Sequence, residues 1–303
     1  MIPVIADQGK SIRNATVNNA LTMIKKIGFI GQGWLGKNYA DWYEKFSQLE
    51  VIRYSLEEPH ISNKDKIGDC DLVFICVPTP TTPEGFDYKN VDEAIGLVGD
   101  QKIALIKSTI LPGTTEVLQK KYPNIKVLFS PEFLTEATAA YDVANPDRNI
   151  IGYASEAGLK VADEVMALLP SAPYKAIIKA TEAEMIKYGG NCWFYYKVVF
   201  INLLYDLSQK LGLDYDVIKN GLAADKRIGA THLDPIHHSG RGAGGSCFIK
   251  DFEAFRRLYN EVVGDEKGKK LLEATVEKNL QLLEDSKKDE DLRRGVYGIG
   301  NEN

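Results

Sequence analysis

The chain contains 303 residues, of which 44% are hydrophobic and 26% are charged, and its formal net charge is −5. This composition is typical of a soluble globular protein that is large enough for two domains. An acidic chain without basic runs is not expected to bind nucleic acid, because phosphate binding requires a basic surface. The sequence has no apolar run long enough to span a bilayer, so we expect a cytoplasmic protein without a membrane partner.

The first segment, residues 1–23, is rich in Asn, Thr and Ala and has no signal pattern. We expect a disordered tail or a short extra helix, and Met23 is an alternative start of the chain. The four cysteines stand singly without a Cys-x-x-Cys pair, which favours a reducing compartment and no zinc. His237 and His238 are adjacent, a spacing that does not suit zinc, so we predict no metal site.

The first predicted strand, residues 26–30, runs into the loop Gly31-Gln32-Gly33-Trp34-Leu35-Gly36, and a segment with helical spacing follows at 37–46. Gly-x-Gly-x-x-Gly between a strand and a helix is the dinucleotide fingerprint, in which glycines allow a tight turn and close approach to the pyrophosphate. The sequence therefore predicts a dinucleotide-binding domain.

The end of the second predicted strand, residues 51–55, bears on the choice of dinucleotide. An acid there normally binds the ribose 2′-hydroxyl, but this chain has Ser55, with Arg53 and Glu57 close by. No arginine cluster for a 2′-phosphate follows. We expect NAD, with NADP as the open alternative.

Later strands alternate with helical segments, which predicts a doubly wound, Rossmann-like parallel sheet. These near-continuous apolar strands are expected at 71–77, 103–107, 126–129, 149–153 and 174–178. Polar loops follow three of them, at 78–83, 108–109 and 130–136, and such loops meet at the ligand crevice of an open α/β sheet. Glu132 and Glu136 are expected to share a helix face, either as site residues or as ordinary acids of a helix N-terminus.

A second, all-helical domain is predicted after the sheet. Thr181-Glu182-Ala183-Glu184 has the spacing of a capping box, and the helix it opens is expected to run to Leu211. Lys187 and Asn191 share one face of this helix, as a site pair or simply as a solvated pair. Two glycines between them indicate that something approaches the helix backbone closely. Amphipathic helices are expected at 251–259 and 267–286.

The most unusual stretch is Gly240-Arg241-Gly242-Ala243-Gly244-Gly245-Ser246-Cys247, followed by Asp251. Dense glycines let a backbone come close to a ligand. If Cys247 opens a helix, Asp251 lies on its face at i+4 and the helix dipole favours a thiolate. The alternative is a flexible loop next to a small buried cysteine.

These motifs together resemble the UDP-glucose/GDP-mannose dehydrogenase family over roughly residues 24–283. The segments that carry the resemblance, in the family's order, are the 31–36 loop, Val77-Pro78-Thr79-Pro80-Thr81, Lys107-Ser108-Thr109 with Pro112-Gly113, Ser130-Pro131-Glu132-Phe133-Leu134-Thr135-Glu136, Asn145-Pro146-Asp147-Arg148, Glu184-x-x-Lys187-x-x-x-Asn191, Arg227-Ile228-Gly229 and Gly242-x-Gly244-Gly245-Ser246-Cys247-Phe248-x-Lys250-Asp251. The cysteine loop points to the members that oxidise UDP-glucose.

The resemblance implies a four-electron, NAD-dependent oxidation of the C6 alcohol of a nucleotide sugar, UDP-glucose to UDP-glucuronate, through a thioester on Cys247. It also implies site residues. The catalytic set is Cys247, Lys187, Asn191, Asp251, Glu132 and Thr109. The cofactor set is Gly31, Gly33, Trp34, Leu35, Gly36, Ser55, Val77, Pro78, Thr79, Ser108, Thr109, Glu136 and Lys250. The substrate set is Glu132, Phe133, Leu134, Glu136, Lys187, Asn191, Arg227, Gly242 and Gly244. Arg227 is implied to reach the neighbouring subunit, and hence a homodimer is expected.

The chain departs from the family pattern in its ends and connections. We divide it into a tail at 1–23, an NAD-binding domain at 24–180, a helical central or dimerisation domain at 181–292 and a tail at 293–303. That last tail resembles only the first strand and turn of the family's third, base-binding domain. We expect a chain that works either alone, with weakened UDP binding, or with a separate chain that supplies this domain. The insertion before Asp71 is also shorter than in the family.

Two other readings remain at this stage. One is a hydroxyacid or polyol dehydrogenase of the related two-domain type, which makes a single two-electron oxidation and has no use for Cys247. The other is a non-catalytic NAD-binding partner subunit. Survival of Cys247, Lys187, Asn191 and Glu132 argues against lost catalysis. The residue pattern leaves the sugar itself undetermined.

Overall fold

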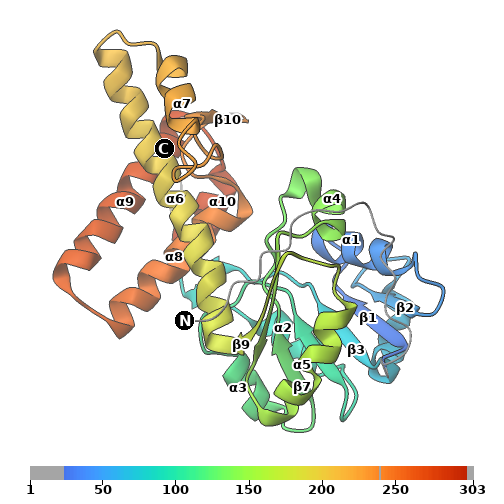
Figure 1. Cartoon of the computed structure of the whole chain (residues 1–303). Helices are drawn as coiled ribbons and strands as arrows, with labels where there is room; N and C mark the ends of the chain where they lie inside the picture. Colours follow the sequence, from blue (N-terminus) through green and yellow to red (C-terminus); the bar gives the residue numbers. More distant parts are fainter. Residues whose placement is uncertain (1–23, 239, 299–303) are drawn as a thin grey trace, which may run out of the picture.

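The computed structural model describes residues 24–238 and 240–298, and the predicted tail at 1–23 lies outside this range. A seven-stranded sheet has the order β2-β1-β3-β6-β7-β8-β9 and forms one lobe (Figure 1). Its strands are β1 (Lys26–Ile30), β2 (Glu50–Tyr54), β3 (Leu72–Ile75), β6 (Ile103–Ile106), β7 (Lys126–Phe129), β8 (Arg148–Tyr153) and β9 (Tyr174–Lys179). The doubly wound, mostly parallel sheet confirms the predicted fold class.

The sheet is not parallel throughout, however. β7 pairs with β8 in antiparallel register, Leu128 opposite Tyr153, whereas β8 and β9 are parallel to each other. The first five strands in the sheet order are therefore parallel, and the last two run the other way. The apolar sequences of 149–153 and 174–178 do not distinguish the two directions, because both faces of the sheet are covered in either case.

Helices cover both faces because alternate strand residues point to opposite sides. Phe29, Phe74 and Leu105 pack under α1 (Trp34–Tyr43), α4 (Ala139–Ala144) and α5 (Glu156–Leu168). Ile30, Ile75 and Ile106 pack on the other face with helices that come from both regions of the chain. These are the 3₁₀ segment η1 (Ile61–Asp69), α2 (Lys89–Ile95), α3 (Thr114–Lys121) and the start of α6.

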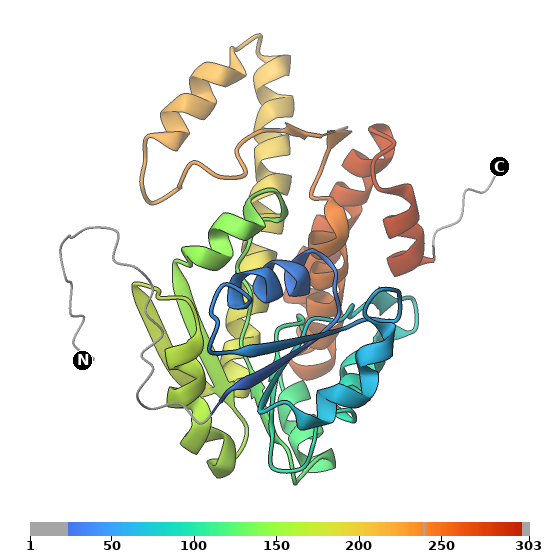
Figure 2. The same ribbon diagram turned by 90° about the vertical axis from the view of Figure 1, so that its right-hand side faces the viewer.

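The second region is built around α6 (Ala180–Lys210), which runs from the sheet lobe into the helical lobe (Figures 1 and 2). It packs with α8 (Gly245–Val262), α9 (Glu266–Asp285) and α10 (Glu290–Tyr297), while α7 (Tyr215–Ala223) lies at its far end. The region is not entirely helical, because β10 (Ile236–His237) and β11 (Gly240–Arg241) form a short antiparallel ribbon. A second ribbon, β4 (Thr81–Thr82) and β5 (Gly85–Phe86), follows β3.

Three local predictions are wrong. The described part of the 293–303 tail does not form a strand: it belongs to α10, whose Val296 packs on Ile249 and Leu283. Residues 131–135 are not helical, so Glu132 and Glu136 share no helix face; Glu136 begins the 3₁₀ turn η2 (Glu136–Thr138). The capping box is displaced: α6 begins at Ala180, and the Glu182 carboxylate accepts the Lys179 N–H.

Glu184 has a different role from the predicted cap of its own helix. It is fully buried, and its carboxylate accepts the Gly113 N–H at 2.6 Å, the Thr115 N–H at 2.9 Å and the Thr115 hydroxyl at 2.5 Å. It therefore caps α3 from α6. Burial raises the pKa of Glu184 to about 7, against the three donors that favour the carboxylate. This contact joins the helical region to the sheet lobe.

Candidate active site

The glycine loop after β1 has the geometry of a dinucleotide cradle. Gly31 has φ +92°, and a Cβ there would collide with the Cys76 carbonyl. A Cβ on Gly36 would collide with the Gly31 carbonyl, whereas Gly33, the N-cap of α1, has open space around it. The first turn of α1 carries no acidic side chain. The open backbone at a helix N-terminus fits a pyrophosphate.

This cradle opens into a cavity of about 1410 Å³ that reaches Cys247. Eleven predicted cofactor residues line it: Gly31, Gly33, Trp34, Leu35, Ser55, Val77, Pro78, Thr79, Ser108, Thr109 and Lys250. Three predicted catalytic residues line it too, namely Glu132, Cys247 and again Thr109. One continuous space thus connects the dinucleotide loop with the cysteine.

The end of β2 is arranged against a 2′-phosphate. The Arg53 guanidinium is held by the Glu44 carboxylate at 2.6 and 2.8 Å and by Asp41 at 2.6 Å. Ser55 donates its hydroxyl to the Glu57 carbonyl at 2.8 Å. The cation at the end of β2 is therefore neutralised, and the added charges of Glu57 and Glu58 in the cavity wall would repel a phosphate.

The loops after β3 and β6 are tied to each other. The Thr79 hydroxyl donates to the Thr109 carbonyl at 2.7 Å, and the Ser108 hydroxyl donates to the Val77 carbonyl at 2.6 Å. The Thr81 hydroxyl donates to the Lys250 carbonyl at 3.0 Å, which connects this edge of the sheet to α8. These hydroxyls hold the cavity wall in place.

Two buried residues of opposite charge meet at Glu132 in the cavity wall. Lys187, on α6, donates to the Glu132 carboxylate after β7 at 2.7 Å, and only 7% and 8% of the two side chains are exposed. The other Glu132 oxygen accepts the Leu134 N–H at 2.9 Å. The structure thus brings together two predicted catalytic residues that lie 55 positions apart.

Lys107 is a second buried cation here, and we did not place it in the predicted site. Its ammonium donates to the Ser130 hydroxyl at 3.2 Å and lies 4.7 Å from the centre of the Tyr39 ring. Burial lowers the pKa of Lys107 to about 8, partly countered by Glu132. The sequence did contain a signal that could have identified it, because Lys107 is a lysine at the carboxyl end of a buried strand.

Cys247 lies in the first turn of α8, as predicted, with Asp251 one turn later. The Asn191 amide donates to Asp251 at 2.6 Å, and Lys250 forms an ion pair with the other Asp251 oxygen at 2.5 Å. Asp251 itself is 1% exposed, whereas Cys247 is half-buried at the cavity. Asn191 of α6 and Lys250 of α8 are therefore both held by Asp251, one helical turn after the cysteine.

The expected thiolate is not favoured by these surroundings. Burial raises the pKa of the Cys247 thiol, and the Asp251 carboxylate raises it further. Lys250 and Lys187 act in the opposite direction, more weakly. These surroundings therefore favour the thiol form of Cys247 in the free protein, in spite of its place at a helix N-terminus.

Several predicted site residues do not line this cavity in the described chain. Lys187, Asn191 and Asp251 are among them, although Lys187 bonds to Glu132 in the cavity wall. Glu136 is exposed on η2, and Gly242 and Gly244 face α9 and the segment that follows it. Arg227 pairs with Asp225 and is 90% exposed. Gly36 packs inside the loop; Phe133 and Leu134 flank Glu132 without reaching the cavity wall, and Phe133 stacks against Arg148 at 3.6 Å.

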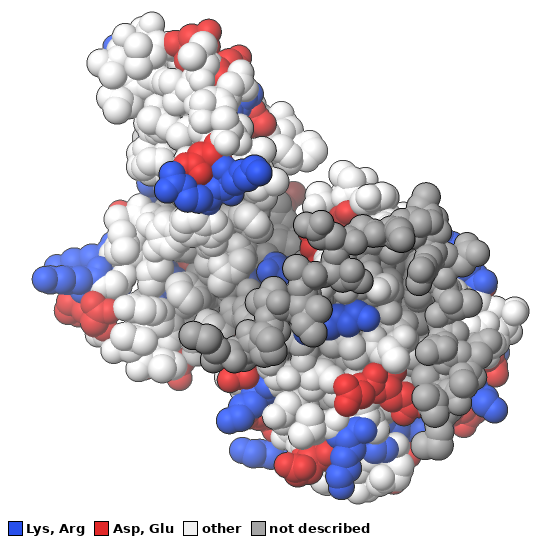
Figure 3. Space-filling view, viewed as in Figure 1, with Lys and Arg blue, Asp and Glu red and all other residues white. Residues whose placement is uncertain are grey.

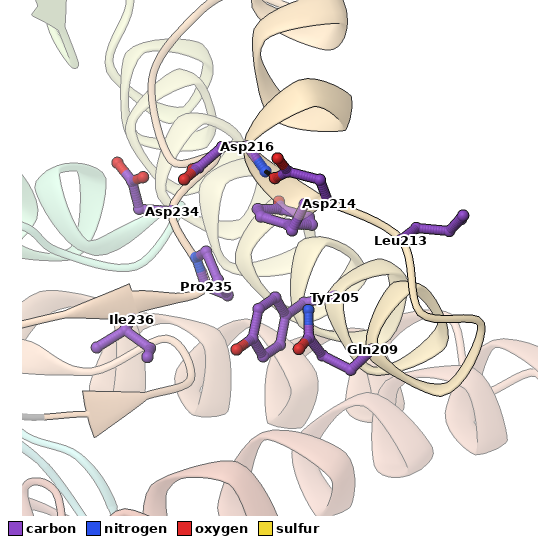
Figure 4. A pocket seen from close by; sticks show the side chains of 9 residues that line it. Tyr205, Gln209, Leu213, Asp214, Asp216, Asp234, Pro235 and Ile236 are labelled. Carbon is purple, nitrogen blue, oxygen red and sulfur yellow. Dashed lines mark hydrogen bonds between the residues drawn. The ribbon is translucent and has the colours of Figure 1, made fainter.

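A smaller cavity of about 380 Å³ lies between α6, α7 and the segment before β10 (Figure 4). Its acids are already satisfied: Asp214 accepts the Asp216 N–H, and Lys219 pairs with Asp216 and Asp234.

The described ranges show neither a metal site nor a membrane span. In them no group of His, Cys, Asp or Glu is arranged to hold a metal ion. No helix there is long and apolar enough to cross a membrane.

Comparison with known proteins agrees with this geometry. Residues 55–169 match the NAD-binding domain of the UDP-glucose/GDP-mannose dehydrogenase family, and residues 181–281 match the central domain of the same family. Together the two matches cover well over half of the chain. The chain belongs to this family. NAD is accordingly the cofactor of the sheet lobe.

Individual members of the family share only a moderate fraction of their residues with this chain. UDP-glucose 6-dehydrogenase of Rickettsia bellii is 31% identical over 71% of this chain and 50% of its own length. A UDP-glucose dehydrogenase structure from Pyrobaculum islandicum superposes with a TM-score of 0.71 at 26% identity, covering 88% of this chain and 70% of that one. The structure of a UDP-D-ManNAc dehydrogenase from Pyrococcus horikoshii superposes with a TM-score of 0.70 at 20% identity, and the match covers 87% of this chain and 72% of that one. The chain spans about half the length of the curated relatives it matches.

Proposed function

We propose that this chain carries the catalytic part of an NAD-dependent nucleotide-sugar 6-dehydrogenase that oxidises UDP-glucose to UDP-glucuronate. The single observation that carries the proposal is that Cys247 and Glu132 line the dinucleotide cavity, where Glu132 is paired with Lys187, and that Asn191 is bonded to Asp251 one helical turn after the cysteine. A simple two-electron alcohol dehydrogenase has no use for a cysteine there.

The residues that would hold NAD line the same cavity as Cys247 and Glu132. The backbone of 31–35 would receive the pyrophosphate, Ser55 and Glu57 would face the ribose, and residues 77–79 would support the nicotinamide side. When bound, NAD would supply the hydride acceptor, with one molecule for each of the two oxidations at the sugar C6.

The first oxidation converts the C6 alcohol to an aldehyde with release of one proton. The Cys247 sulfur then adds to the aldehyde carbon and forms a thiohemiacetal, and its second oxidation leaves a thioester. Water adds to the thioester, the carbon–sulfur bond breaks, and the carboxylate leaves the regenerated thiol. The sum is one alcohol, two NAD and one water to one carboxylate, two NADH and three protons.

The surrounding side chains suit these steps. Lys187 would stabilise the oxyanions, and Asn191 would help to position the reacting oxygen. Glu132 would move the protons of the hydrolysis, with Asp251 and Thr109 holding the water. Since Lys187 and Glu132 are paired at 2.7 Å, protonation of Glu132 would release the ammonium for an oxyanion.

We further propose a homodimer across α6. Four large apolar side chains of this helix, at seven-residue spacing, are exposed: Ile186, Trp193, Phe200 and Leu207. The face drawn in Figure 3 has a broad uncharged area over the helical lobe. Gly189 and Gly190 have open space on their outer side, so no element of the described chain makes the predicted close approach. Arg227 would extend from one subunit toward the other's site.

The experiment is the number of NADH molecules formed per sugar by the purified chain, with UDP-glucose, GDP-mannose and UDP-ManNAc offered in parallel. Two NADH per UDP-glucose, and a Cys247→Ser variant that stops before the acid, are expected. One NADH per sugar, unaffected by the loss of Cys247, would replace the proposal with a two-electron dehydrogenase. Turnover of another sugar alone would change the substrate and keep the mechanism.

A further inference from the structure

The glycine loop before Cys247 was expected to lie against a ligand, but it lies against the chain itself. The Ala243 N–H donates to the Asn279 side-chain oxygen on α9 at 2.7 Å, and the Asn279 amide donates back to the Ala243 carbonyl at 3.0 Å. Gly242 has φ +86°, and a Cβ there would press on Asn279, Leu282 and Leu283. This glycine is thus required by α9.

The segment between α9 and α10 completes the enclosure. The Arg241 N–H donates to the Ser286 hydroxyl at 2.9 Å. Lys288 is 6% exposed, and its ammonium donates to the Gly242 carbonyl at 3.2 Å and to the Gly240 carbonyl at 3.4 Å. A buried lysine whose ammonium donates to two carbonyls of one loop holds the backbone of that loop in place.

Asp289 reaches the start of the cysteine helix itself. Its carboxylate accepts the Gly245 N–H, the first of α8, at 2.7 Å. A Cβ on Gly244 would collide with this carboxylate and with the Lys288 stem. The N-cap Gly244 has no side chain that could cap the helix, so Asp289 supplies the cap from 44 residues away.

We propose that Lys288 and Asp289 are positioning residues that hold the first turn of α8, and with it Cys247, at the cavity. The pair acts as a clasp: Lys288 holds the loop carbonyls, and Asp289 holds the helix N-terminus two residues before the thiol. The inference rests on the proposed role of Cys247. It deepens that role by assigning the accessibility of the nucleophile to a segment outside the cavity.

The test is the alkylation of Cys247 by iodoacetamide in the full chain, followed by peptide mass spectrometry, and it needs no turnover. The buried Cys70, Cys76 and Cys192 are internal standards. Loss of the cap in Asp289→Ala is expected to raise the Cys247 rate about fivefold through local opening, with the other three unchanged. Lys288→Met is expected to act in the same direction. Asp289→Asn keeps an acceptor and should stay within about twofold of the parent.

The matched control is Asp285→Ala, which removes an exposed carboxylate from the end of α9. Its Cys247 rate should equal that of the parent. The proposal is overturned if Asp289→Ala reacts like the parent, or if all four cysteines speed up together. It is also overturned if Asp289→Asn reacts as fast as Asp289→Ala, since the effect would then belong to charge. A chain that passes this test but makes no NADH would contradict only the proposed function.

Discussion

The Lys187 ammonium lies 2.7 Å from the Glu132 carboxylate, and both side chains are more than nine-tenths buried. Breaking such a pair leaves an uncompensated buried charge. We expect Lys187→Met or Glu132→Leu alone to lower the free energy of unfolding by about 3–5 kcal/mol. The double variant should be more stable than either single one. Urea denaturation of the parent, the two single variants and the double variant measures this double-mutant cycle.

A matched surface pair gives the control. Lys89 and Glu93, one turn apart on α2, lie 3.7 Å from each other and are both largely exposed. Removing either should change the unfolding free energy by less than about 0.5 kcal/mol. Additive losses for the buried pair, as for two unrelated sites, would show that the two charges do not depend on each other.

The acidity of Cys247 is a second prediction. Because burial and Asp251 raise the pKa of the thiol above its ordinary value, the thiolate fraction and the alkylation rate should still be rising with pH at 9. Asp251→Asn removes a negative charge and should move the midpoint to lower pH, while Lys250→Met removes a positive charge and should move it higher. A profile that is flat from pH 7 upward would mean that the thiolate is already formed.

Glu184 provides a third prediction, on stability. Both oxygens of its carboxylate accept hydrogen bonds from a total of three donors. In Glu184→Gln the side-chain NH₂ replaces one of these oxygens and faces a backbone N–H, so two donors meet without an acceptor. The variant should lower the free energy of unfolding by about 2 kcal/mol. Glu182→Gln is the matched control, because an exposed glutamine at this position can still accept the Lys179 N–H. Equal losses in the two variants would show that the cap of α3 does not depend on Glu184.

Much of this architecture follows from local sequence. The apolar strands, the loop at 31–36 and the long helix were predicted with ends within a few residues of those observed. The site residues at the ends of β3, β6 and β7 also follow, because adjacent parallel strands end at one edge. Glu132 and Lys187 could be expected at one site, but their direct pairing could not.

What the sequence did not reveal depends on contacts between distant segments. Glu184 has the spacing of a cap for its own helix, yet it is drawn to α3 by tertiary packing. The 293–303 tail was expected to resemble a strand and turn, but its residues up to Tyr297 belong to the helix α10, in which Val296 packs on Ile249 and Leu283. The glycines of the cysteine loop signal close approach correctly; only the structure shows that the approaching groups are Asn279, Lys288 and Asp289.

The proposed dimer gives a fourth prediction. Phe200 is 61% exposed on α6, and a charge there would be buried in the interface, so Phe200→Glu should convert a dimer into a monomer. Val117→Glu places the same charge on an exposed apolar position of α3 and should leave the assembly unchanged. Light scattering after size exclusion measures both. A monomeric parent, or a dimer that tolerates the charge on α6, would remove this interface from the account.

The most direct test of the central claim is the intact mass of the chain after mixing with NAD and UDP-glucose. Loss of the proton-transfer group in Glu132→Gln should slow thioester hydrolysis about 100-fold or more, so that a covalent adduct accumulates. We expect a mass increase of one UDP-glucuronyl group on Cys247 in Glu132→Gln and none in the double variant Glu132→Gln/Cys247→Ser. Formation of NADH and acid by Glu132→Gln without any adduct, or by Cys247→Ser at the parent's rate, would contradict a thioester on Cys247.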